Sequence, residues 1–295
     1  MKPRLLTKKN TYTFDYPEAI AYAQMQRSIF WTPDEIRVDK DLQSIMVEAT
    51  EAEKHGIITT LKLFTLYELI AGGEYWGGRV LKRFQRPDIQ MMANCFSFFE
   101  LNVHAPFYNK INEVQNLNTD SFYNSYLDDQ VLKERIEFLE SLMRDKDDLK
   151  SLAVFSMVEG AILYSSFAFL KHFQSEGKNI MMNVVRGINF SVRDENIHSE
   201  AGAWLYRTLY KESLELGLLS DKDIEKLHDT IYEAGRVLME HEKEINKKIF
   251  EVGPMEGITQ HQMDNFGESR VDKTLVQLGL ERIFKPTYNP ISPWF

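Results

Sequence analysis

The sequence predicts an all-α protein built as one large bundle of long helices. The chain has 295 residues, 43% of them apolar, so it can bury a large core within the size range of a single helical domain. Only 15 glycines and 9 prolines interrupt it, and they do not mark out the short, regularly spaced strands of a β-sandwich or barrel. The segments between these breakers are long enough for helices of many turns.

In the N-terminal half, an irregular segment is expected to extend through Pro33. The first long helix is expected from Leu42 to Ala71, because this stretch holds few breakers and Gly72-Gly73 forms a helix-stop signal. A second helix should begin at Pro87, a favoured first-turn residue, and end near Val114. A shorter, charged amphipathic helix is expected over Asp128–Met143.

In the C-terminal half, three long helices are expected over Ser151–Phe173, Asn179–Leu216 and Asp221–Phe250, with Asp221 as the N-cap of the third. A last helix should span Gln260–Leu278. Three prolines in Glu281–Phe295 prevent a helix there, so this tail is expected to be extended and mobile. The expected organisation is one domain over residues 1–280 and a tail over 281–295.

Composition excludes several classes of protein. The formal net charge of -9 argues against a nucleic-acid partner, because phosphate binding requires clustered Lys and Arg. A single cysteine, Cys95, rules out an intramolecular disulfide framework and a Cys-rich metal site, and it fits a reducing, cytoplasmic compartment. The apolar stretch Leu152–Leu170 is long enough to cross a membrane, but its one charge falls in the middle, so we expect a core helix and no membrane partner.

That single charge, Glu159, is the clearest sign of chemistry. Apolar and small residues surround it on every side of the predicted helix and leave no polar face for it to occupy. A buried carboxylate needs a cation, a metal ion or hydrogen-bond donors. Glu159 is therefore expected to meet one of these inside the bundle.

Two further helices carry a carboxylate and an imidazole on one face. Glu195 and His198 stand at i and i+3, the Glu-x-x-His unit of dimetal helical bundles. Glu100 and His104 stand at i and i+4 instead. Pro106 explains the extra residue: it cannot donate to the carbonyl four residues earlier, so a π-bulge is expected there, and a bulge would align the pair as i and i+3 would.

Such bundles also need a second lone carboxylate, which Glu68 matches near the end of the first long helix. Each residue alone is more often a surface or structural group, but the joint order along four helices favours a dinuclear metal site. Carboxylates and imidazoles suit iron or manganese, with Fe–Fe as the first choice and Mn–Mn or Mn–Fe as alternatives. The predicted ligands are Glu68, Glu100, His104, Glu159, Glu195 and His198.

Over nearly its whole length, the chain resembles the ferritin-like small subunit of class I ribonucleotide reductase. Phe30–Ile36 is similar to the family's Phe-Trp-x-Pro-x-Glu motif, whose Trp, here Trp31, begins a radical-transfer path. Arg193–His198 is similar to Arg-Asp-Glu-x-x-His, which implies that Asp194 hydrogen-bonds both a ligand His and that Trp. Glu68 occupies a position where many members have Asp.

The resemblance also implies two tyrosine roles. Tyr108, four residues after His104, has the spacing of the family's radical tyrosine, although a Tyr at this position could also simply pack in the core. Tyr288 is the only tyrosine of the tail and would relay the radical to the large catalytic subunit, which the tail would bind. The implied protein is a homodimer that reduces ribonucleotides only together with that large subunit. A stand-alone dimetal oxygenase or oxidase, a storage protein and a bundle with degenerate ligands remain alternatives.

Overall fold

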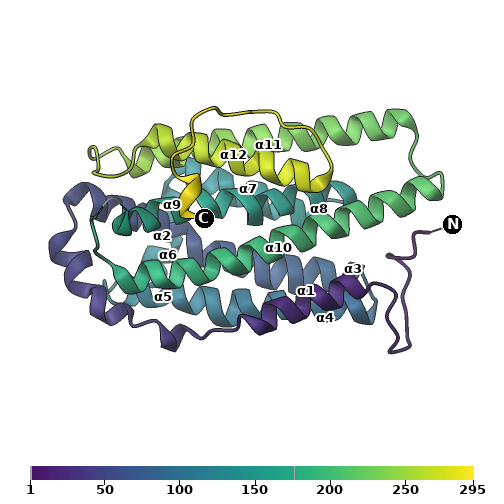
Figure 1. Cartoon of the computed structure of the whole chain (residues 1–295), viewed down its shortest axis with the longest axis horizontal. Coiled ribbons are helices and arrows are strands. Elements are labelled where there is room, and N and C mark those ends of the chain that lie inside the picture. Colours follow the sequence, from purple (N-terminus) through teal and green to yellow (C-terminus); the bar gives the residue numbers. More distant parts are fainter. Residues whose placement is uncertain (1, 176) are drawn as a thin grey trace.

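The computed structural model describes residues 2–175 and 177–295 and shows long helices running side by side as a bundle (Figure 1). Within these residues, β-type pairing is limited to an isolated bridge between Met255 and Ile258. The all-α prediction is therefore confirmed. The longer helices are α1 (Pro17–Ser28), α2 (Glu51–Glu68), α4 (Pro87–Phe99), α5 (Ala105–Glu113), α7 (Gln130–Arg144), α8 (Asp148–Met157), α9 (Leu163–Lys171), α10 (Met182–Glu215), α11 (Asp221–Ile249) and α12 (Gln260–Leu278). The shorter α3 and α6 cover Leu81–Arg83 and Asp120–Asn124.

Three of the long helices contain π-helical segments, in which the backbone N–H of residue i+5 donates to the carbonyl of residue i. The segment η4 (Leu69–Val80) joins α2 to α3, η5 (Glu100–His104) joins α4 to α5, and η7 (Val158–Ile162) joins α8 to α9. None of these junctions breaks the helix. These three helices and α10 carry the six predicted ligands, and they are called the inner helices below.

The π-bulge expected before Pro106 is confirmed as η5. The N–H of Ala105 donates to the carbonyl of Glu100, five residues back, because Pro106 has no N–H to continue the α-helical ladder. The helix from Pro87 thus runs through to Glu113, close to its predicted end.

The first long helix is interrupted near its predicted start and runs past its predicted end. Helical residues begin at Leu42, as predicted, and include the π-helical segment η3 (Ser44–Glu48), but the chain leaves the helix at Ala49 and Thr50. Thr50 and Glu53 form a reciprocal cap, with Thr50 N donating to the Glu53 carboxylate over 2.8 Å, so α2 begins only at Glu51. The helix then continues past Gly72 through η4 to Arg83. A β-carbon at Gly72 would lie 2.7 Å from that of Glu100, so this glycine permits close helix packing and does not end the helix.

Two smaller predictions also need correction. The segment before Pro33, expected to be irregular, contains α1, whose buried face consists of the small residues Ala19 and Ala23 together with Gln26. A face this weakly apolar gave no clear helical pattern. At the start of α11 the N-cap is Ser220, whose hydroxyl oxygen accepts the N–H of Asp223, and not Asp221.

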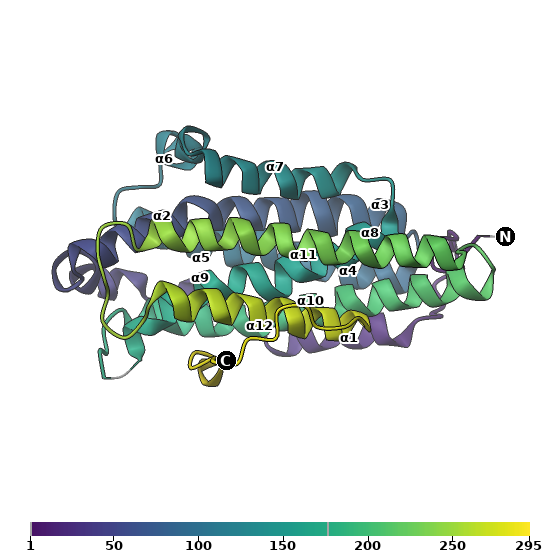
Figure 2. The ribbon, with the colours of Figure 1, turned by 90° about the horizontal axis from the view of Figure 1, so that it is seen from above.

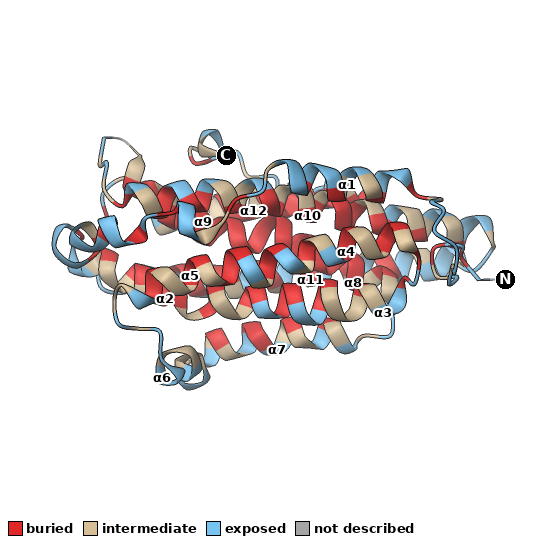
Figure 3. Ribbon diagram, turned by 90° about the horizontal axis from the view of Figure 1, so that it is seen from below, coloured by how far each residue is buried: buried red, intermediate tan, exposed pale blue. Residues whose placement is uncertain are grey.

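The helix formed by α8, η7 and α9 lies at the centre of the bundle. It packs against α10 and α12 and also contacts α11 and α2. Figures 2 and 3 show the bundle from above and from below. The span Asp148–Gln174 is long and apolar enough to cross a membrane, yet its apolar window is entirely buried inside the protein. The prediction of a core helix is confirmed, and this helix places Glu159 at the middle of the molecule.

Candidate metal centre

The six predicted ligands meet in the core of the bundle. Each is at most 1% exposed, and they come from the four inner helices: Glu68 from the end of α2, Glu100 and His104 from η5, Glu159 from η7, Glu195 and His198 from α10. Their ligand atoms form two overlapping groups, each with all its atoms within 4.8 Å of one another. The first group is Glu68, Glu100, His104 and Glu195, and the second is Glu100, Glu159, Glu195 and His198.

Glu100 and Glu195 belong to both groups and present carboxylate oxygens to each of them. The Nδ1 atom of His104 lies 2.8 Å from Glu100 Oε2 and 3.1 Å from Glu195 Oε1. The Nδ1 atom of His198 lies 2.6 Å from Glu100 Oε1 and 3.6 Å from Glu195 Oε2. Both imidazoles therefore direct Nδ1 toward the shared carboxylates.

The π-helical segments decide where these side chains point. In η5 the extra residue returns His104 to the face of Glu100, so the i, i+4 pair meets at 2.8 Å. In η7, which the sequence did not reveal, the carbonyls released from α-helical bonding find new donors. The Nε of Arg270 donates to Gly160 O over 2.8 Å.

Gly160 itself has no room for a side chain. A β-carbon there would lie 2.2 Å from Ser199 Oγ and 2.5 Å from Thr274 Oγ1. The turn of η7 that carries Glu159 therefore sits directly against α10 and α12, and any added volume would have to displace one of these helices.

The charges of the site are unbalanced without cations. The pKa of Glu68 is raised well above its ordinary value by burial and by the charge of Glu100, and that of Glu159 by burial and by Glu195. Burial opposes the ionisation of Glu100, but His198 and His104 hold its pKa well below the ordinary value. Burial likewise opposes the charge on His104, yet its pKa is raised well above the ordinary value by Glu100 and by hydrogen bonds to Asp194 and Glu195.

The donor set fits a pair of metal ions. Both carboxylate oxygens of Glu68, one oxygen of Glu159 and the Nε2 atom of His198 are buried without a hydrogen-bond partner among the described residues. Unpaired buried polar atoms are costly, and so many in one place indicate missing cations. Oxygen and imidazole donors without thiolate suit iron or manganese.

Asp194 connects the site to Trp31. The buried Asp194 Oδ2 accepts from Trp31 Nε1 over 2.7 Å and from His104 Nε2 over 2.9 Å, and its Oδ1 accepts from Gln26 Nε2 over 2.8 Å. The hydrogen bond from Nε2 keeps a proton on that nitrogen, so Nδ1 is the nitrogen that would bind a metal ion in exchange for its own proton. The rings of Trp31 and His104 lie nearly parallel, with centroids 6.0 Å apart.

Tyr108 is fully buried beside the same group. Its hydroxyl has no hydrogen-bond partner in the described part of the chain, and its pKa is raised well above the ordinary value by burial and by the charge of Glu68. Its ring stacks on Phe64 with centroids 4.6 Å apart and lies 5.1 Å from Phe107. Of the ten predicted site residues, Tyr288 stands apart, because it is 55% exposed in the tail.

Sequence reasoning missed three supporting residues: Gln26, Arg270 and Trp76. The Nε1 of the buried Trp76 donates to Glu159 Oε1 over 2.8 Å. Trp76 stands eight residues after Glu68, a helical spacing, but the helix was expected to end at Ala71. The misplaced helix end hid this signal.

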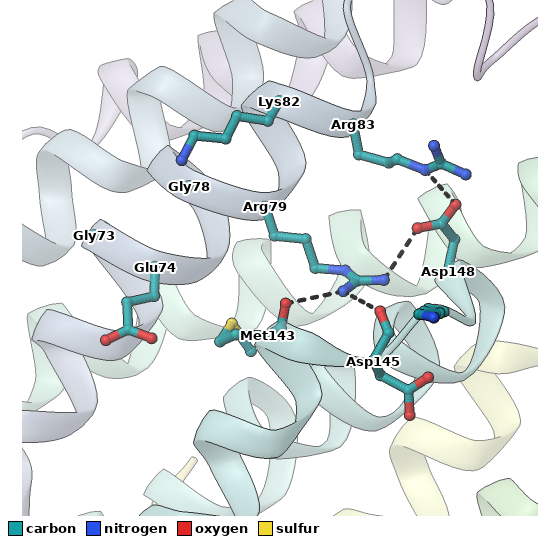
Figure 4. A pocket seen from close by; sticks show the side chains of 10 residues that line it. Gly73, Glu74, Gly78, Arg79, Lys82, Arg83, Met143, Asp145 and Asp148 are labelled. Atoms are coloured by element: carbon teal, nitrogen blue, oxygen red, sulfur yellow. Dashed lines mark hydrogen bonds and ion pairs between the residues drawn. The ribbon is translucent and has the colours of Figure 1, made fainter.

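A surface cavity of about 690 Å³ near Arg79, between η4 and the start of α8, is not part of this site (Figure 4). Arg79 donates there to the carbonyls of Met143 and Asp145, over 3.1 and 2.6 Å, and to Asp148 over 3.0 Å. Its guanidinium is thus used to tie the end of α7 to α8. Four other surface cavities of about 260 to 620 Å³ also contain none of the predicted ligands in their walls.

The chain is similar in sequence to proteins of one known family. Residues 8–290 match the family model of the ribonucleotide reductase small chain. A probable ribonucleoside-diphosphate reductase small subunit of Invertebrate iridescent virus 3 is 24% identical, over 99% of this chain and 80% of the relative. The ribonucleoside-diphosphate reductase subunit beta of Mycoplasmoides gallisepticum is 26% identical, over 90% of this chain and 74% of the relative.

Solved structures show the same fold. The dimanganese(II) form of NrdF from Streptococcus sanguinis superposes with a TM-score of 0.80 at 21% identity, over 97% of this chain and 98% of that one. A putative class I ribonucleotide reductase from Bacillus halodurans gives a TM-score of 0.82 at 22% identity, over 94% and 98% of the two chains. With the family model matching nearly the whole sequence, the chain belongs to the ribonucleotide reductase small-chain family.

Proposed function

We propose that this chain generates and stores a radical on Tyr108 and delivers it to a large catalytic subunit that reduces ribonucleotides. One observation carries the proposal. Trp31 and His104 donate to the same oxygen of Asp194, so a single buried carboxylate joins the ligand cluster to an aromatic residue that can pass on an electron. A metal-storage bundle or a structural bundle has no need of this connection.

Two ions would be held by the overlapping groups. One would lie among Glu68, Glu100, His104 and Glu195, and the other among Glu100, Glu159, Glu195 and His198. When bound, iron or manganese at these positions would supply the oxidising power, drawn from O₂ or a reduced oxygen species, to remove one electron from a nearby phenol. Fe–Fe is our first choice, with Mn–Mn and Mn–Fe as alternatives.

Tyr108 is suited to store that oxidising equivalent. Its phenol is completely buried, and the rings of Phe64 and Phe107 lie against it, so water and small reductants are kept from the ring. Tyr108 would give up one electron to the oxidising metal site and its proton to a base of that site, for which the nearby carboxylate of Glu68 is the candidate, and would become a neutral radical.

Delivery would use Asp194, Trp31 and Tyr288 in that order, and the tail would bind the large subunit. Trp31 is only 2% exposed, so the electron has to cross from the interior to the partner through further groups. Tyr288, exposed in the tail, is the tyrosine available to continue the path. Membership of the family supports this partner, and so do the aromatic residues of the tail, since aromatic anchors dominate binding at protein interfaces. A reducing, cytoplasmic compartment would suit the free thiol of Cys95.

A homodimer is also proposed. Phe30 and Phe98 are 51% and 47% exposed, and their ring centroids lie 6.3 Å apart on the surface beside α4. Adjacent aromatic rings are enriched in the cores of protein interfaces, so this face is the expected contact with a second copy. Light scattering of wild type and Phe98→Asp would test it, with a monomer expected for the variant.

The function is tested by loading metal-free protein with Fe(II), exposing it to O₂ and recording EPR spectra with metal quantification. About two metal ions per chain and a tyrosyl signal are expected, and the signal should disappear in Tyr108→Phe. Tyr75→Phe is the matched control, since Tyr75 is also fully buried and its hydroxyl has no hydrogen-bond partner within residues 2–175 and 177–295. Metal binding without any tyrosyl signal would refute radical storage and favour a stand-alone oxygenase. Failure to bind two metals would refute the ligand assignment.

A further inference from the structure

The tail segment, Glu281–Phe295, which its prolines predict to be extended and mobile, lies along α12 in the structure (Figures 1 and 2). Its beginning is held by Asp272 of α12, which is 3% exposed. Asp272 Oδ1 accepts the backbone N–H groups of Ile283 and Phe284 over 2.8 and 3.1 Å, and Oδ2 accepts that of Lys285 over 2.7 Å. Three charge-assisted hydrogen bonds therefore direct the tail back over the protein.

The end of the tail fills a site between α9 and α12. The Phe295 ring stacks on Phe266 with centroids 4.8 Å apart and lies 5.5 Å from the ring of Tyr164. The ammonium of Lys171 lies 4.5 Å from the centre of the Phe295 ring, a cation–π distance. Ile291, four residues earlier, is only 1% exposed.

The walls of this site are held in place by bonds that do not involve the tail. The Tyr164 hydroxyl donates to Val192 O of α10 over 3.0 Å, and the guanidinium of Arg270 lies 3.5 Å from the centre of the Tyr164 ring. Arg270 also donates to Gly160 O, next to Glu159. A preformed site loses little conformational entropy when a peptide binds, so the rings of Tyr164 and Phe266 are ready to receive an aromatic side chain.

We infer that this surface, formed by Tyr164, Lys171, Phe266 and Ser269, is a peptide-binding site for the aromatic segment Ile291–Phe295 of the same chain. We call it the tail site. Asn289 Nδ2 adds a donor to Ser269 Oγ over 2.6 Å and sets the register of the segment. The ligand class is a short peptide in which an aromatic residue follows an aliphatic residue by four positions. The site supplies the ammonium of Lys171 beside the aromatic ring.

The consequence rests on the proposed function, because the large subunit is proposed to bind the same tail. Phe295 cannot occupy the tail site and a partner's groove at once. The apparent affinity for the large subunit is then the affinity of the free tail multiplied by the fraction of chains whose tail is free. If the free state is populated to about 10%, as is common for a minor conformer, opening the tail site should tighten the large-subunit complex about tenfold.

The test places 4-fluorophenylalanine at position 295 of the full chain and records ¹⁹F NMR spectra. A resonance shifted from that of the free tail peptide, and independent of protein concentration, is expected for wild type. It should move toward the free-peptide position in Lys171→Gln and in Phe266→Ala. Lys211→Gln is the matched control, since Lys211 is an exposed lysine of α10 whose ion-pair partner, Glu215, lies on the same helix. Lys171→Gln keeps the test valid if Phe266→Ala, a core change, fails to fold.

The affinity of each variant for the large subunit is then measured. Binding about two- to fourfold tighter than that of wild type is expected for Lys171→Gln, because losing one cation–π contact frees only part of the docked tails, and the tenfold limit applies to full opening. A free-peptide resonance in wild type would overturn the inference. A shift that appears only as protein concentration rises would overturn it too, because the occupant would be the tail of a second copy. A docked resonance in wild type, with no binding of the large subunit by any variant, would leave the tail site standing and refute the proposed function.

Discussion

Asp194→Asn is the substitution that most directly tests how the protein supports its ligands. The amide has nearly the shape of the carboxylate, so its oxygen can keep the donors from Trp31 and His104. Its nitrogen would face the Gln26 donor, 2.8 Å away, but Gln26 can rotate its amide and present Oε1, which has no partner among the described residues. The variant should therefore fold, and what it loses is the negative charge.

The size of the effect follows from the bond to His104. A hydrogen bond to a charged acceptor contributes about 1.5–3 kcal/mol and a neutral one about 0.5–1.5 kcal/mol, so the 2.9 Å bond weakens by about 1 kcal/mol. The weaker bond also holds the imidazole less firmly with Nδ1 toward the ligand cluster. Loss of such outer support typically lowers metal affinity by about 10- to 100-fold, or about 1.4–2.7 kcal/mol.

The assay is a titration of metal-free protein with Mn(II), with the free ion quantified by EPR. Asp41→Asn is the control: Asp41 is 4% exposed and accepts from Val184 N and Asn183 Nδ2, each over 2.7 Å, at the start of α10. It should lower the free energy of unfolding but leave Mn(II) affinity within about twofold. Unchanged affinity in Asp194→Asn would refute the support of His104 by Asp194. An equal loss in both variants would mean that α10 as a whole had loosened.

Three further outcomes follow from the packing and the charges. Gly160→Ala should destabilise the fold by about 1–3 kcal/mol and weaken metal binding, because the added β-carbon would lie 2.2 Å from a serine oxygen of α10. The control Gly73→Ala, whose β-carbon would have nothing within 4 Å, should leave both stability and metal binding unchanged. Arg135→Met should cost about 3–5 kcal/mol in urea unfolding, because it leaves the buried carboxylate of Glu242, now 3.0 Å from the guanidinium, without its cation. Burial alone would raise the pKa of Glu53, but the nearby imidazole of His172 and the hydrogen bonds donated by an ammonium and a backbone N–H lower it to about 2 from 4.5. The stability that Glu53 contributes is thus present above about pH 4.5 and lost as the pH falls toward 2, and Glu53→Gln should flatten this part of the pH–stability curve.

Each of these outcomes has a result that contradicts it. Equal behaviour of the two glycine variants would show that the inner helices yield easily around η7. A loss below about 1 kcal/mol in Arg135→Met would show that Glu242 is stabilised by groups other than the guanidinium. A pH–stability difference between wild type and Glu53→Gln that stays constant from pH 7 to pH 2 would mean that Glu53 does not titrate in this range.

Local rules in the sequence were enough to predict the helical class, the four inner helices and the bulge before Pro106. Pro106 has no N–H to donate to the carbonyl four residues back, and the burial of Glu159 can be predicted from its apolar neighbours in the sequence. The same local reasoning failed at Gly72, because a glycine that permits close approach of another helix looks in sequence like one that ends a helix. It failed at α1 as well, where the buried face is carried by alanines.

What the sequence by itself determined is therefore which helices form and which of them carry carboxylates and imidazoles. Only the tertiary structure decided that Glu100 and Glu195 are shared between two groups of ligands, that Trp76 donates to Glu159, and that Phe295 lies against Tyr164. The physical reason is the range of the interactions. Helix periodicity and backbone hydrogen bonds act over a few residues, whereas these contacts join residues far apart in the chain and depend on how neighbouring helices pack and in which register.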